Sequence, residues 1–171
     1  MNWDAIADGA RAESSLWGDA LRPERAEEPV FSPLADERFA VGLETIYEGY
    51  LVHYGTPRLF APADPDAALL LGDYLYAHGL VRVAEAGDVD AVADLSELIS
   101  LCSQLRAENA DGDGALWAAT AATLGSGARL DEARSALRLR GDASVLDAAA
   151  RRVAGDAAVE QALAAHAGRV R

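Results

Sequence analysis

The stretch DPDAALLLGDYLYAHGLVRVAEAG, residues 64–87, predicts one long helix that is buried on all sides. Asp64 suits the N-cap position, and Pro65 suits the first helical position, where its missing N–H group costs nothing. Gly87 can take the left-handed conformation that ends many helices. Because apolar residues cover most of the circumference between these ends, we expect other helices to surround this one.

Two glycines and one acidic residue interrupt the apolar residues of this helix. Gly72 and Gly79 each cost about 1 kcal/mol relative to Ala, which indicates close crossings with neighbouring helices. Asp73 lies one turn from Leu69, so we expect its carboxylate within an apolar face, where it needs a hydrogen-bond donor. A Tyr hydroxyl or a backbone N–H of a neighbouring helix is the simplest donor, and a bound ligand is the alternative.

The composition indicates an all-α fold, which we expect to be an antiparallel helical bundle. Hydrophobic residues make up 51% of the chain and aromatic residues only 6%, with Ala and Leu most abundant. This balance is typical of helices that pack through small side chains. The 171 residues suffice for one core. We predict an N-terminal helix and Pro-rich linker over residues 1–31 and a single helical domain over residues 32–171.

The charge balance disfavours nucleic acids and anionic membranes as partners. The 28 Asp and Glu residues outnumber 15 basic residues, all of them Arg, and the net charge is −13. Cys102 is the only cysteine, so no disulfide forms within the chain. The N-terminus is acidic, and no apolar run approaches the roughly 20 residues of a membrane span. We therefore expect a cytoplasmic protein without a membrane span.

The first 53 residues predict two helices joined by a solvated linker. The first covers about residues 2–21 and is anchored by Trp3 and Trp17, and the linker at 22–32 is rich in Pro, Glu and Arg. The second helix is expected from Ser32 to about His53.

Glu44 and Glu48 lie one turn apart on this second helix. We expect both carboxylates to face water, as charges on helices usually do, with a binding groove as the alternative.

Gly-Asp pairs predict where the later helices end and begin. Gly87-Asp88, Gly141-Asp142 and Gly155-Asp156 each combine a helix stop with a helix cap. Cys102 falls on an apolar face without a basic neighbour, which favours a buried structural thiol over a nucleophile. The expected helices cover residues 88–105, 115–124, 130–140, 144–153 and 156–166.

No sequence pattern points to a catalytic group, a metal site or a cofactor. The three histidines lie on different expected helices and form no pair at the helical spacing of a metal site. A calcium loop starting at Asn109 would need Glu where Thr120 stands. No Gly-x-Ser-x-Gly motif is present. The residues alone therefore predict a helical domain without an assigned chemistry.

A pattern of three segments resembles the middle of a trans-polyprenyl diphosphate synthase, over about residues 36–107. The segments are YEGYLVH at 47–53, GTP at 55–57 and LLLGDYLY at 69–76. In that family a helix ending in His leads into an aspartate-rich motif, then Arg-Arg-Gly-x-Pro, then a helix containing Gly-Asp-x-Leu. Here only Tyr54 separates the first two segments, so the aspartate-rich motif and both arginines are missing.

The resemblance implies a reduced isoprenoid-synthase-like fold that lacks the family's catalytic apparatus. The missing carboxylates would hold the magnesium ions that ionise an allylic diphosphate, and the missing arginines would bind the second diphosphate. The second aspartate-rich motif also has no counterpart, and the chain contains no Asp-Asp pair. The chain is similar to the noncatalytic small component of heptaprenyl diphosphate synthases, which implies an accessory subunit in isoprenoid biosynthesis.

Four residues of the resembling region are candidates for ligand binding: His53, Asp73, Tyr50 and Tyr76. The expected partner is a catalytic prenyl diphosphate synthase or a second copy of this chain. A stand-alone protein-interaction module and a protein that binds a prenyl lipid are the alternatives. A contiguous apolar patch would favour the subunit, because a solitary module should be covered by charged side chains.

Overall fold

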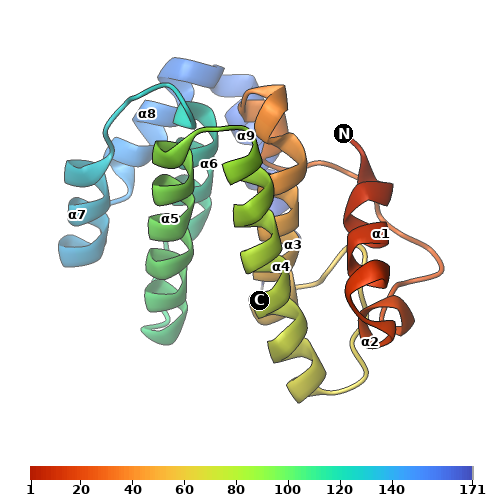
Figure 1. Ribbon diagram of the computed structural model, residues 1–171. Coiled ribbons are helices and arrows are strands. Elements are labelled where there is room, and N and C mark those ends of the chain that lie inside the picture. Colours follow the sequence, from red (N-terminus) through yellow and green to blue (C-terminus); the bar gives the residue numbers. More distant parts are fainter. Residues whose placement is uncertain (171) are drawn as a thin grey trace.

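The computed structural model describes residues 1–170, and they confirm an all-α fold (Figure 1). Within this range we find two isolated β-bridges, Leu21 with Phe60 and Gly55 with Val170, and no β-strand. The α-helices are α1 (Trp3–Glu13), α2 (Ser15–Asp19), α3 (Ala40–Tyr54), α4 (Pro65–Glu85), α5 (Val89–Ala107), α6 (Asp113–Thr123), α7 (Asp131–Arg140), α8 (Ser144–Ala154) and α9 (Asp156–Ala167).

Helix α3 is enclosed, as is most of α6, whereas the expectation that residues 64–87 would be surrounded is wrong. Every residue from 42 to 51 is buried. In α4, by contrast, Leu69, Leu70 and Val81 remain 55%, 57% and 54% exposed. Apolar residues around a whole helix do not specify what covers them, and here α3, α5 and α1 cover only part of α4 (Figure 1).

Close crossing of α3 and α4 confirms the interpretation of the glycines. A Cβ atom added at Gly79 would lie 2.4 Å from Ile46 Cγ1 and 2.8 Å from the carbonyl oxygen of Gly42. A Cβ atom added at Gly72 would lie 2.3 Å from His53 Nε2. Only glycine permits these approaches, so the two helices pack backbone to backbone.

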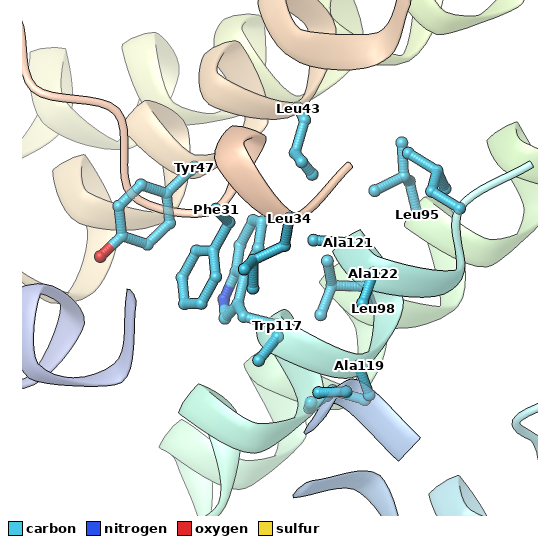
Figure 2. Close-up of a cluster of buried hydrophobic side chains, with 14 of the residues drawn as sticks. Phe31, Leu34, Leu43, Tyr47, Leu95, Leu98, Trp117, Ala119, Ala121 and Ala122 are labelled. Carbon is cyan, nitrogen blue, oxygen red and sulfur yellow. The ribbon is translucent and has the colours of Figure 1, made fainter. Parts of the chain in front are cut away.

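The main core lies between α3, α5 and α6 (Figure 2). Phe31 stacks on Trp117 of α6 with ring centroids 5.4 Å apart, and it meets the edge of Tyr47 at 5.0 Å. Leu95 and Leu98 of α5 close the other side of this core.

The segment before α3 differs from its prediction in two ways. Val30 and Phe31, at the end of the expected solvated linker, are buried in the main core. Helix α3 begins at Ala40, because residues 32–34 and 37–39 form two separate 3-10 turns instead of helix. The chain therefore enters the core before its helix begins.

The N-terminal helices α1 and α2 pack against their own chain through a second apolar cluster. Trp3 and Trp17 are buried, as predicted for anchors, and they join Leu71 and Leu75 of α4. The expected single helix is interrupted at Ser14, whose hydroxyl caps α2 by accepting from Leu16 N at 3.2 Å.

The later helices lie within a few residues of their predicted bounds. Gly87 takes a φ of 77°, and the Asp88 carboxylate caps α5 by accepting from Ala91 N at 2.9 Å. Gly141 and Gly155 also have positive φ, at 66° and 85°. Cys102 is fully buried, as expected for a structural thiol.

Candidate functional site

Three of the four candidate residues lie together where α3 meets α4. His53 Nε2 is 3.3 Å from Asp73 Oδ1, and the His53 and Tyr76 rings are 5.2 Å apart between centroids. Tyr54 lies beside His53 at 5.5 Å and beside Tyr50 at 5.3 Å. Tyr50 therefore adjoins this group through Tyr54 but makes its own polar contacts elsewhere.

The contact between His53 and Asp73 corrects the expectation for the acidic residue. The Asp73 side chain is 67% exposed and lies outside the apolar interface of α4. Burial lowers the pKa of His53, and the Asp73 carboxylate only partly opposes this effect. The imidazole is therefore neutral at pH 7, and its ring packs over Gly72.

Tyr76 contributes a buried hydroxyl without a hydrogen-bond partner among the described residues. Burial is the main cause that raises its pKa well above the usual value of a tyrosine, so the phenol stays protonated. The ring fills the space between α3 and α4, which gives Tyr76 a packing role.

Tyr50 belongs to a polar network that joins four helices. The carboxylate of Asp113 in α6 accepts hydrogen bonds from the Tyr50 hydroxyl and from Arg106 Nη2. Arg106 Nε donates to the Tyr50 oxygen at 2.7 Å. His166 Nε2 of α9 lies 3.3 Å from Asp113 Oδ2, and His166 Nδ1 lies 3.0 Å from the Tyr47 hydroxyl.

The electrostatics of this network keep the carboxyl group of Asp113 ionised and the hydroxyl groups of Tyr47 and Tyr50 protonated. Burial alone would raise the pKa of Asp113, but His166, Tyr50 and Arg106 outweigh it and hold that pKa well below its usual range. Burial, with the Asp113 charge, raises the pKa of Tyr50. Asp113 thus works as a charged acceptor that ties α3, α5, α6 and α9 together.

A surface pocket of about 490 Å³ opens beside this network at the end of α5. The Tyr54 hydroxyl donates to Ser103 Oγ at 3.4 Å across one side of it. The loop after α5 closes the other side, with Asn109 held at a φ of 52°. The lining residues are Tyr54, Ser103, Arg106, Ala107, Asn109, Ala110 and Asp111.

A second buried charge cluster contradicts the expectation that Glu44 and Glu48 face water. Both side chains are fully buried with Arg58. Arg58 Nη1 donates to Glu44 Oε2 at 2.5 Å, and Arg58 Nε donates to Glu48 Oε2 at 2.9 Å. The attraction of the two carboxylates outweighs the effect of burial and raises the pKa of Arg58.

Backbone amides complete this cluster. Glu44 Oε1 accepts from the N–H groups of Val30, Phe31 and Ser32 at 2.9, 3.0 and 2.8 Å. Glu48 Oε1 accepts from Leu59 N at 2.7 Å. The two glutamates therefore fasten two loop segments to α3, and this structural role explains their burial.

The described residues offer neither a cluster of metal ligands nor a membrane-spanning helix. Within residues 1–170, no group of three or more His, Cys, Asp or Glu side chains is placed to hold a metal ion. No helix in that range combines the length and apolar character needed to cross a membrane.

The outer side of α4 carries several exposed apolar side chains. We define the α4 face as Leu69, Leu70, Ala77, Val81 and Ala84, which are all exposed. Other large apolar residues that are exposed lie at the N-terminus and on α2, α5, α7 and α8, and these are Met1, Leu16, Val89, Leu139, Val145 and Val153. Exposed apolar side chains on one helix are unexpected in a chain with a net charge of −13, so the α4 face is a candidate for binding.

Comparison with known proteins adds no relative. No family model matches this chain, and neither a curated protein nor a solved structure matches it significantly. The resemblance to trans-polyprenyl diphosphate synthases therefore rests on the sequence motifs alone.

Proposed function

We propose that this protein is a noncatalytic helical subunit that binds a catalytic prenyl diphosphate synthase through the α4 face. The observation that carries the proposal is the exposure of Leu69, Leu70 and Val81, each more than half exposed on a chain of net charge −13. Extended apolar patches on an otherwise charged surface mark sites of protein interaction.

The positions of the motif residues support a scaffold rather than a catalytic role. Gly72 lies under the His53 ring, and Asp73 and Tyr76 lie against that same ring. The segments that carry the resemblance therefore meet at the α3–α4 crossing. A chain that keeps this crossing and lacks the aspartate-rich motifs fits an accessory subunit, which positions or stabilises a catalytic relative.

Coexpression with a full-length trans-polyprenyl diphosphate synthase from the same organism tests the proposal. We expect a complex by size-exclusion chromatography with light scattering, together with a change in prenyl-transfer rate or product length. Val81→Asp should abolish the complex, because it places a charge in the α4 face. The matched control Leu139→Asp alters an apolar residue on α7 that is also more than half exposed, and it should leave the complex intact.

Three outcomes would contradict the proposal. No complex forms, or the complex survives Val81→Asp, or Leu139→Asp disrupts it equally. A prenyl lipid found by mass spectrometry in the purified chain, without a synthase partner, would favour the lipid-binding alternative. Capture of an unrelated protein through the α4 face would favour the stand-alone interaction module.

A further inference from the structure

We infer that the partner presents to the α4 face an apolar helix bordered by basic side chains. This inference deepens the proposed function and rests on it. It assigns the chemistry of the surface that binds here, and the charges on α4 and the geometry of the α4 face carry the argument.

The exposed charged side chains of α4 are all acidic. Asp66, Asp73 and Glu85 are the exposed charged residues of α4, and Asp90 follows at the start of α5. The one arginine of α4, Arg82, turns away toward α1, where its Nη2 donates to the carbonyl oxygen of Ala5 at 2.6 Å. A partner with flanking Arg or Lys would therefore meet carboxylates on this face.

These carboxylates have no arginine partner of their own. No ion pair to Arg is found for Asp66, Asp73 or Glu85 within residues 1–170, and the imidazole of His53 that contacts Asp73 is neutral. By contrast, Asp88 and Glu97, near or on α5, pair with Arg38 and Arg138. Acidic groups along the α4 face are thus available to a basic partner.

The geometry of the α4 face suits a helix. Leu70, Ala77 and Val81 are spaced by seven and four residues, so their side chains form one line along the exposed side of α4. A partner helix with apolar residues at the same spacing would interdigitate with this line.

The α4 face by itself is smaller than one side of a standard interface. Helix α4 has 21 residues and is therefore about 32 Å long. Figure 1 shows α5 beside α4, with no described helix in front of either. A helix about 10 Å wide and of this length presents about 320 Å², less than half of the roughly 800 Å² that each partner contributes to a standard interface, so the partner must also contact the neighbouring surface of α5.

A second copy of the chain fits this face poorly. Two-fold pairing of α4 with its own copy would bring Asp66, Asp73 and Glu85 toward the same three residues, because such an interface uses one patch twice. Each protomer also carries a net charge of −13. Repulsion therefore disfavours this pairing.

Three synthetic helical peptides, matched to the 21 residues of α4, test the inference on the full chain. They share one stripe of Leu and Ala and carry Arg, Gln or Glu on both flanks. Fluorescence anisotropy should show that the Arg peptide binds about tenfold more tightly than the Gln peptide at low salt, as three exposed ion pairs would give. High salt should reduce this advantage.

Two variants with equal loss of charge show where the peptide binds. The first neutralises the α4 face and should remove most of the Arg advantage: Asp66→Asn, Asp73→Asn and Glu85→Gln. The second neutralises exposed carboxylates on other segments and should keep it: Glu24→Gln, Glu132→Gln and Glu160→Gln.

The inference is overturned if the Gln or Glu peptide binds as tightly as the Arg peptide, or if both variants weaken binding equally. Dimerisation of the chain that Val81→Asp abolishes would also overturn it, since the occupant would then be a second copy. The two proposals fail separately. A synthase complex that depends on Val81, without preference for the Arg peptide, overturns only the inference, whereas selective Arg-peptide binding without any synthase complex overturns the proposed function.

Discussion

Replacing Arg58 with Met should lower the free energy of unfolding by about 3–5 kcal/mol, the usual result of leaving buried charges without their partner. Arg58 is 1% exposed. Its guanidinium donates four hydrogen bonds, to the carboxylates of Glu44 and Glu48 and to the carbonyl oxygens of Glu28 and Glu44. Methionine fills part of the volume but supplies none of these donors.

The geometry shows which carboxylate suffers more. Without Arg58, Glu44 keeps three backbone N–H donors, whereas Glu48 keeps only that of Leu59. Most of the loss should therefore come from Glu48. Arg58→Lys should recover part of the stability, because it restores the charge without the planar fork that reaches both glutamates.

Urea unfolding followed by circular dichroism measures these changes by linear extrapolation. Arg38→Met is the matched control, since Arg38 pairs with Asp88 at 3.1 Å on the surface. That exposed pair should contribute about 0–1 kcal/mol. If Arg58→Met lowers the free energy of unfolding no more than Arg38→Met does, the reasoning that the buried cluster holds the two loop segments on α3 is refuted.

Three further predictions concern other buried positions. Gly79→Ala should lower stability by about 1–3 kcal/mol in the same urea assay, because the new Cβ would meet Ile46 and a backbone oxygen at 2.4 and 2.8 Å; an unchanged midpoint would contradict the close crossing. Asp113→Asn should cost about 1–3 kcal/mol at pH 7. The folded-state pKa of Asp113 lies below its unfolded value. The stability difference between the unsubstituted chain and Asp113→Asn should therefore be complete above about pH 4 and shrink as the pH falls further. A stability difference that grows in acid would refute the conclusion that Asp113 is a charged acceptor. Cys102, whose pKa burial raises well above normal, should react with a thiol reagent at pH 8 only after unfolding, so rapid reaction of the native chain would contradict its burial.

The bounds of most helices were predictable because caps and stops act locally. Asp64 accepts from Ala67 N at 2.8 Å at the start of α4, and Gly87 takes a positive φ just after that helix. The close crossing of α3 and α4 was also predictable, since glycine inside a helix is costly unless another backbone approaches. Each of these inferences needed only neighbouring residues.

The candidate site was only partly predictable. The sequence marked His53, Asp73 and Tyr76 as candidates for ligand binding, and their contact with one another came only from the tertiary structure. The network around Asp113 was missed, because it joins residues distant in sequence. No local pattern marks Arg106 or His166 as partners of that carboxylate.

The sequence by itself determined the all-α class, the helix ends and the glycine contacts, because propensity, capping and periodicity are local properties of the chain. Only the tertiary structure decided that α3 is enclosed while α4 keeps an exposed apolar face. Only the tertiary structure placed Glu44 and Glu48 in the interior. Their burial depends on hydrogen-bond donors from Arg58 and from residues 30–32 and 59. These donors reach α3 only in the folded chain, so the spacing of the two glutamates cannot reveal them.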